Sequence, residues 1–221
     1  MAYKCIIFDF DGTLADTEQQ VFQLYNDMAE KYKYRKVTHE ELQHIKELNI
    51  ADIMEIVDIP FYRLPRVLRE GQRGLREEKD SIKAFKPHLR DFMRALESET
   101  EIRGILTSNV KKTVNAFLRN YAIADCFDFV VCSSLLSKEK KIKKVAKKYR
   151  LELSEILYIG DETRDIEACH RAGVDVVAVD WGYNTLAALE RCNPTYTASP
   201  LEEILEIVRS QDDEGCSEAA I

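Results

Sequence analysis

The sequence predicts an α/β fold, a doubly wound parallel sheet with a helical domain inserted into it. From residue 87 onward, short apolar runs alternate with segments of helical periodicity. This alternation is typical of a parallel sheet covered by helices on both faces. The stretch between the first and second expected strands shows helical patterns only. A chain of 221 residues is long enough for one such domain with a modest insertion.

Five strands are expected, because each segment is short, mostly apolar and followed by polar or turn-forming residues. They cover residues 3–8, 102–106, 127–131, 156–159 and 174–179. In the segments between and after the later strands, apolar side chains recur at three- and four-residue spacing, which predicts helices. These helices cover residues 89–96, 110–121, 138–149, 165–172, 185–190 and 200–209.

Only helices are expected in the insertion after the first strand. Thr38 followed by Glu41 has the pattern of a capping box and begins one helix, and Pro60 ends another. The four helical segments cover residues 18–34, 38–47, 50–57 and 64–79. We therefore expect residues 1–14 and 84–210 to form the core, residues 15–83 to form a helical cap, and residues 211–221 to form a disordered acidic tail.

Charge and composition exclude several classes of function. The net charge of −7 gives no general attraction to nucleic acid or to an anionic membrane surface. No apolar stretch approaches the roughly 18–20 residues that cross a bilayer. The six cysteines are scattered without a C-x-x-C pair, which is typical of free thiols in a reducing compartment. We expect a cytoplasmic protein that binds neither nucleic acid nor membrane.

Polar side chains follow four of the expected strands. Ligands of a parallel sheet bind beyond the carboxyl ends of its strands, so these side chains are expected to meet at one edge. The carboxylates among them would repel one another without a divalent cation, and oxygen-only ligands favour Mg²⁺. The set comprises Asp9, Asp11, Gly12 and Thr13, then Thr107, Ser108 and Asn109, then Ser133, Ser134 and Lys138, and finally residues 160–165.

This set of groups predicts phosphoryl transfer. A carboxylate can attack phosphorus to form an aspartyl phosphate, which divides one difficult hydrolysis into two easier steps. A second carboxylate two residues further on can protonate the leaving alkoxide and then take a proton from the attacking water. A cation, a lysine and a hydroxyl would stabilise the charge on the phosphoryl oxygens. Gly12 allows the sharp turn that brings the backbone near the phosphate.

Four motifs, in this order along the chain, resemble those of the haloacid dehalogenase-like (HAD) hydrolases. They are D-F-D-G-T-L at residues 9–14, T-S-N at residues 107–109, Lys138, and G-D-E-T-R-D at residues 160–165. The resemblance implies a Rossmann-like core that uses Mg²⁺. The helical insertion between the first two motifs resembles the cap of the phosphoglycolate phosphatase-like subgroup.

The resemblance also implies catalytic roles. Asp9 would be the nucleophile, and Asp11 would be the general acid and base. Thr107 would hold a phosphoryl oxygen, with Ser108 as the alternative. Lys138 would pair with the nucleophile and the phosphate; Lys140 and Lys141 are the alternatives for this position.

The implied metal ligands come from the first and last motifs. Asp9 and Asp161 would bind Mg²⁺ directly, and Asp11 would contribute its backbone carbonyl. Asp165 would orient metal-bound water or Lys138. The expected metal set is therefore Asp9, Asp11, Asp161 and Asp165.

We therefore expect a Mg²⁺-dependent phosphatase that hydrolyses a small phosphorylated metabolite through an aspartyl phosphate. Two alternatives share the same residues. A sugar phosphomutase of this fold would pass the phosphoryl group to a second hydroxyl instead of water. A non-catalytic binding or regulatory protein would keep the fold without turnover. The sequence predicts no oligomeric state.

Overall fold

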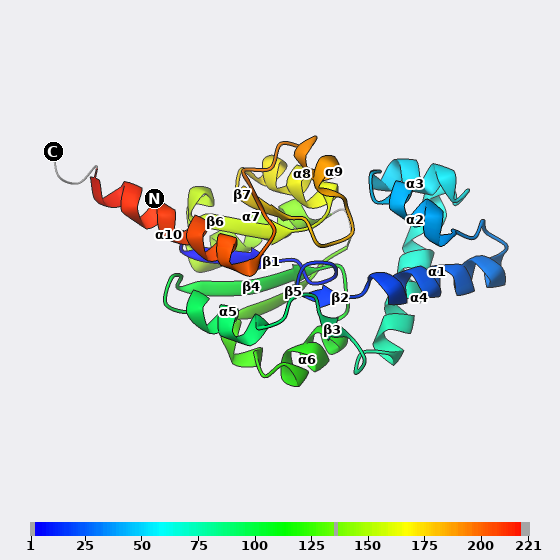
Figure 1. The fold of residues 1–221 in the computed structure, drawn as a ribbon, viewed down its shortest axis with the longest axis horizontal. Coiled ribbons are helices and arrows are strands. Elements are labelled where there is room, and N and C mark those ends of the chain that lie inside the picture. Colours follow the sequence, from blue (N-terminus) through cyan, green and yellow to red (C-terminus); the bar gives the residue numbers. More distant parts are fainter. Residues whose placement is uncertain (1–2, 135–136, 218–221) are drawn as a thin grey trace.

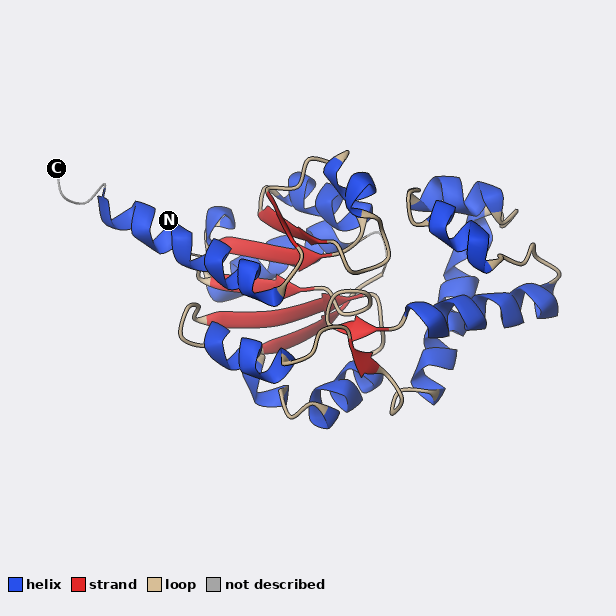
Figure 2. Cartoon of the chain, viewed as in Figure 1, coloured by secondary structure: helices blue, strands red, loops and turns tan. Residues whose placement is uncertain are grey.

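The computed structural model describes residues 3–134 and 137–217. Its centre is a parallel sheet of six strands in the order β5-β4-β1-β6-β7-β8, which confirms the predicted fold class (Figures 1 and 2). The strands are β1 (Cys5–Phe8), β4 (Ile102–Thr107), β5 (Phe129–Cys132), β6 (Ile156–Gly160), β7 (Asp175–Val179) and β8 (Tyr196–Ala198). The sequence did not predict β8, since three residues, of which only Ala198 is buried, carry too short a pattern.

Alternate side chains of β1 pack on opposite faces of the sheet. Ile6 and Phe8 belong to the hydrophobic core on one face, whereas Cys5 and Ile7 belong to the core on the other. The first face is covered by α5 (Leu89–Leu96), α6 (Lys111–Asn120) and α10 (Leu201–Ser217). The second is covered by α7 (Lys138–Tyr149), α8 (Thr163–Ala172) and α9 (Leu186–Glu190). Short 3₁₀ turns lie at Ala124–Cys126 and Leu153–Glu155.

The C-terminal helix differs from the sequence prediction of a disordered tail at residues 211–221. α10 continues to Ser217, so residues 211–217 are helical, and residues 218–221 lie outside the described part of the chain. Gln211 and Glu214 are good helix formers, and no proline interrupts the segment.

A second group of helices forms the insertion between β1 and β4. The helices are α1 (Glu18–Tyr32), α2 (His39–Ile45), α3 (Ile50–Ile56) and α4 (Leu64–Glu77), with a 3₁₀ turn at Phe61–Arg63. Thr38 and Glu41 form the predicted capping box at the start of α2. In Figure 1 these helices lie together beyond the ends of the strands, apart from the helices that cover the sheet.

The chain enters and leaves this helical group through a small antiparallel pair of strands. β2 (Ala15–Asp16) pairs with β3 (Lys83–Ala84), close to the expected boundaries of the insertion. At the other side, the segment after α2 contacts the core, because the Asn184 side-chain amide donates to the carbonyls of Lys46 (2.8 Å) and Leu48 (3.2 Å). Among the described residues, no helix is long and apolar enough to cross a membrane.

Candidate active site

The order of the strands brings the predicted motifs to one edge of the sheet. β1 lies between β4 and β6 with Phe8 opposite both Ile105 and Ile159. Asp9 continues this register, because its backbone N–H donates to the Ile159 carbonyl at 2.8 Å. The residues that follow β1, β4 and β6 therefore lie side by side, since parallel strands end at the same edge. The buried polar residues there include Asp9, Thr107, Lys138, Asp161 and Asp165.

Lys138 connects two of the predicted carboxylates. Its ammonium group lies 2.7 Å from Asp9 Oδ2 and 2.5 Å from Asp165 Oδ1, although Asp9 is 129 residues away in the sequence. Burial by itself would lower the pKa of Lys138, but the charges of Asp165 and Asp9 outweigh it and hold the pKa above its usual value. Of the other two lysines considered for this position, Lys140 is exposed and Lys141 is half-buried. Lys138 is the lysine that the structure places among the carboxylates.

Asp161 is held by groups from two different loops. The Thr13 hydroxyl donates to its Oδ1 at 2.6 Å, and the backbone N–H of Tyr183 donates to its Oδ2 at 2.8 Å. Burial raises the pKa of Asp161 well above its usual value, and the charges of Glu162 and Asp9 raise it further. Asp161 is therefore a fixed carboxylate in a strongly negative environment.

Three carboxylates converge closely enough to share a cation. Oxygen atoms of Asp9, Glu162 and Asp165 all lie within 4.8 Å of one another. Burial raises the pKa of Asp165, and the charges of Asp9 and Glu162 act in the same direction against the opposing charge of Lys138. In addition, Asp165 Oδ2 is buried without a hydrogen-bond partner among the described residues. An all-oxygen site with mutual repulsion and an unpaired buried oxygen fits a hard divalent cation such as Mg²⁺.

Glu162 is the member of this cluster that sequence reasoning missed. It stands in the last motif between Asp161 and Arg164, but no role was assigned to it. Its neighbour in the sequence, Asp161, is not part of the three-residue cluster, because its oxygens are turned toward Thr13 and Tyr183. The position of Glu162 within the motif was the available signal, but the direction of its side chain depends on how β6 and α8 meet.

Asp11 lies in a separate set of hydrogen bonds. The Asn109 amide donates to its two oxygens at 3.0 and 3.2 Å, and the Thr17 hydroxyl donates to Oδ1 at 3.0 Å. The hydroxyls of Thr17 and Tyr183 are in turn 2.6 Å apart. Burial raises the pKa of Asp11 to about 6, helped by the charge of Asp9 and opposed by the hydrogen bonds from Asn109 and Thr17. The carboxyl can therefore exchange a proton near neutral pH.

The two hydroxyls that were considered for phosphate binding occupy different surroundings. Thr107 is fully buried, and its Oγ1 accepts from the backbone N–H of Asn109 at 2.9 Å, which leaves its own hydroxyl hydrogen to donate. Ser108 is half-buried, and its carbonyl accepts a hydrogen bond from Gln72 of α4. The loop after β4 thus meets both the buried site and the helical insertion.

These features define an α/β enzyme in which a helical insertion lies next to a buried, carboxylate-rich site. A family model for haloacid dehalogenase-like hydrolases matches residues 6–179. The chain belongs to this family, as its motifs predicted.

Named relatives cover nearly the whole chain. It is 28% identical to a phosphoglycolate phosphatase from Synechococcus elongatus, over 93% of this chain and 97% of the relative. It is 24% identical to the pyrophosphatase PpaX from Oceanobacillus iheyensis, over 94% of this chain and 98% of the relative.

Solved structures share the fold at lower identity. A haloacid dehalogenase-like family hydrolase from Streptococcus pneumoniae superposes with a TM-score of 0.75 at 19% identity, covering 92% of this chain and 97% of that one. A protein from Thermotoga maritima, named as a candidate beta-phosphoglucomutase, does so with a TM-score of 0.61 at 23% identity, covering 94% and 99%. At this level of identity the similarity is one of fold.

Proposed function

We propose that the chain is a Mg²⁺-dependent phosphatase that hydrolyses a small phosphomonoester through an aspartyl phosphate on Asp9. The observation that carries the proposal is the environment of two carboxylates two residues apart. Asp9 is hydrogen-bonded to Lys138, whereas Asp11 has its pKa raised to about 6. One group is thereby suited to attack and the other to proton transfer. The relatives named as phosphatases support the same activity.

The acidic cluster is the proposed place of the cation. Asp9 would hold Mg²⁺ together with Asp161 and the backbone carbonyl of Asp11, and carboxylate oxygens of Glu162 and Asp165 lie within 4.8 Å of an oxygen of Asp9. When bound, Mg²⁺ would offset the negative charge of the carboxylates and of the phosphoryl oxygens. The unpaired Oδ2 of Asp165 supports this assignment, because a buried oxygen without a partner is costly unless a ligand reaches it.

The residues of this chain account for both halves of the reaction. An oxygen of Asp9 attacks phosphorus, the bond from phosphorus to the leaving oxygen breaks, and Asp11 gives its proton to that oxygen. Asp11 then takes a proton from water as the water attacks the phosphorus of the aspartyl phosphate. This second attack breaks the bond to Asp9 and releases phosphate. Lys138 and Thr107 would stabilise charge on the phosphoryl oxygens.

The helical insertion would exclude water during these steps. We propose a core of residues 1–14 and 84–210 and a cap of residues 15–83. The cap would close over the site, and the hydrogen bonds from Asn184 to the carbonyls of Lys46 and Leu48 support this closure. We also propose that the enzyme is cytoplasmic and acts on a small phosphorylated metabolite.

The test is phosphate release from a panel of phosphomonoesters with and without Mg²⁺. The panel contains phosphoglycolate, sugar phosphates, nucleotides and an aryl phosphate, and Asp9→Asn is the blank. We expect release that depends on Mg²⁺ and is lost in the variant. Retained turnover in pure Asp9→Asn would exclude Asp9 as the nucleophile. A phosphomutase would instead convert one sugar phosphate to another without net phosphate release, and a binding protein would act on no member of the panel.

A further inference from the structure

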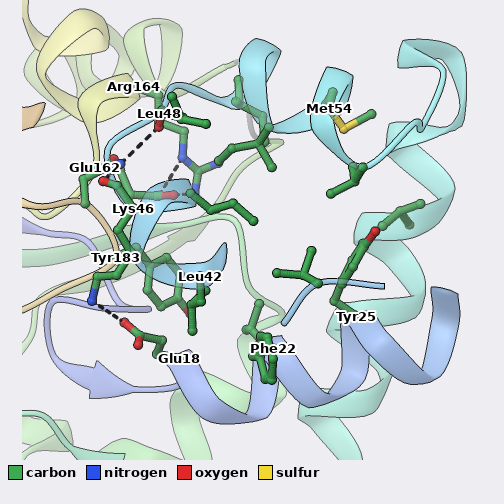
Figure 3. Close-up of a pocket in the computed structure, with 18 of the residues that line it drawn as sticks. Glu18, Phe22, Tyr25, Leu42, Lys46, Leu48, Met54, Glu162, Arg164 and Tyr183 are labelled. Carbon is green, nitrogen blue, oxygen red and sulfur yellow. Dashed lines mark hydrogen bonds and ion pairs between the residues drawn. The ribbon is translucent and has the colours of Figure 1, made fainter. Parts of the chain in front are cut away.

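An apolar cavity of about 280 Å³ lies between the helical insertion and the core. Figure 3 shows side chains of α1, α2 and α3 reaching into it, among them Phe22, Tyr25, Leu42 and Met54. Most of the other residues that line it are aliphatic. An apolar cavity of about 150 Å³ can take a benzene ring, so this one has room for an aryl or branched alkyl group.

One end of the cavity is formed by residues of the candidate active site. Glu162 lines it and also belongs to the carboxylate cluster with Asp9 and Asp165. Tyr183 lines the same end, and its hydroxyl contacts Thr17, which donates to Asp11. In Figure 3, Glu162 and Tyr183 lie on the side of the cavity opposite Tyr25 and Met54. Asp9, Asp11 and Lys138 are not among the lining residues, so a group bound in the cavity would lie beside the carboxylate cluster and meet it at Glu162.

Arg164 adds a polar position at this end. Its Nε and Nη2 both donate to Glu162 Oε2, whereas its Nη1 is buried and has no hydrogen-bond partner among the described residues. Because the surface of Nη1 is covered by protein atoms, this nitrogen does not face the open volume of the cavity. The cavity thus combines a large apolar volume with the paired side chains of Arg164 and Glu162 at one end, and a mostly apolar lining with few polar groups is typical of a small-molecule site.

We infer that this cavity holds the leaving group of the substrate, and that the preferred substrates are phosphomonoesters of alcohols with an aryl or branched alkyl body. The inference rests on the proposed phosphatase function and specifies its substrate class. The apolar body of the leaving group would occupy the space between α1, α2 and α3. A short, fully polar leaving group would leave the apolar volume unfilled.

The test compares 2-phenylethyl phosphate with ethyl phosphate. Both release a primary alkoxide of similar basicity, so a difference in kcat/KM reports how the rest of the leaving group is bound. We expect kcat/KM to be at least about tenfold higher for 2-phenylethyl phosphate. Leu42→Trp fills part of the cavity and should lower the ratio of the two kcat/KM values at least about tenfold. Gln43→Trp adds the same side chain at an exposed position of α2 and should leave the ratio within about twofold.

The outcomes separate this inference from the proposed function. Hydrolysis of ethyl phosphate with equal or higher kcat/KM, or a ratio unchanged by Leu42→Trp, would overturn the inference while the phosphatase function stands. If neither ester is hydrolysed but a member of the phosphomonoester panel is, the inference is overturned while the phosphatase function stands; if no phosphomonoester is hydrolysed, the phosphatase function fails. Calorimetric titration of both esters into Asp9→Asn then tests the cavity without turnover, and equal affinities would overturn the inference. Ile45→Phe is the second cavity-filling variant if thermal melting shows that Leu42→Trp is not folded.

Discussion

The backbone at Gly182 packs so closely against Asp161 that a Cβ atom at position 182 would overlap the side chain of Asp161. The adjacent residue, Tyr183, donates its backbone N–H to the same carboxylate. The loop after β7 therefore both confines the Asp161 side chain and hydrogen-bonds to it. Gly12 also packs against the Asp161 side chain, with the same consequence for an added Cβ, and its φ of +81° is itself unfavourable for other residues.

We predict that Gly182→Ala displaces Asp161 and lowers both stability and activity. Forcing atoms into a packed site typically costs about 1–3 kcal/mol of unfolding free energy. Gly71→Ala is the matched control, because its added methyl would meet only Met28 Cε at 3.9 Å and it lies within α4. Alanine is favoured there by about 0.5–1 kcal/mol. Denaturant unfolding and the Mg²⁺ concentration needed for half-maximal phosphate release measure both effects, and unchanged values in Gly182→Ala would contradict this role for Gly182.

We predict that Lys138→Met strongly lowers phosphate release, whereas Lys140→Met leaves it nearly unchanged. Lys138→Met leaves Asp9 and Asp165 buried without their cation, and removing one partner of a buried ion pair costs about 3–5 kcal/mol. Phosphate release should fall by at least about a hundredfold. Lys140 is exposed, so its substitution should change phosphate release by less than about twofold. Steady-state kinetics and thermal melting provide the measurements. A larger loss in Lys140→Met than in Lys138→Met would assign the motif lysine differently.

We predict that the effect of Asp11→Asn depends on the leaving group. Ethyl phosphate needs a proton on its leaving oxygen, so its hydrolysis should fall by about 10²–10⁴-fold. 4-Nitrophenyl phosphate has a good leaving group, so its first bond cleavage should be affected less. Because Asp11 is also needed to activate water, the variant should then accumulate aspartyl phosphate. Rapid-mixing measurements should show a burst of nitrophenol close to one equivalent per enzyme. Equal losses for both substrates without a burst would argue against Asp11 as the acid and base.

We predict that Mg²⁺ stabilises the protein more at pH 8 than at pH 5. The folded protein raises the pKa of Asp11 to about 6 and also raises the pKa of Asp165. These groups bind protons more tightly in the folded state than in the unfolded state. Their contribution to the free energy of unfolding is therefore fully present below the unfolded pKa of about 4. It is lost as the pH rises through the folded pKa values. Metal-free protein should therefore melt at lower temperature as the pH rises across this window.

The control for this prediction is the same titration with a chelator present. Mg²⁺ should raise the melting temperature mainly where the carboxylates are ionised, by mass action on the folded state. Asp161→Asn should reduce the Mg²⁺-dependent increase. A stabilisation of equal size at pH 5 and pH 8 would show that Mg²⁺ binding does not depend on the ionisation of these carboxylates.

Much of the fold was predictable because its signals are local. The apolar runs of β1 and β6 and the periodic helices α5 and α7 lie where the sequence indicated them, and the capping box at Thr38 begins α2 as expected. The short strands β2, β3 and β8 were not predicted, since two or three residues have no measurable period. Their strand geometry comes from their partners.

Most residues of the candidate site were predictable from the sequence, but their contacts were not. The motifs indicated that Asp9, Lys138 and Asp165 would meet at the carboxyl edge, because parallel strands end together. The side-chain contacts could not be predicted from the sequence. These include the hydrogen bonds from Asn109 and Thr17 to Asp11, the position of Glu162 in the carboxylate cluster, and the nitrogen of Arg164 that has no hydrogen-bond partner among the described residues.

The sequence by itself determined the α/β class, the inserted helices, the family and the set of polar residues at the strand ends. These follow from hydrophobic period and motif spacing, which are properties of neighbouring residues. The tertiary structure alone decided which groups touch and what the insertion encloses. Lys138 lies against Asp9 only because of the strand order, and the apolar cavity exists only because α1, α2 and α3 close against the loop that carries Glu162. Such contacts join residues far apart in the chain, and their geometry depends on the packing of the whole molecule.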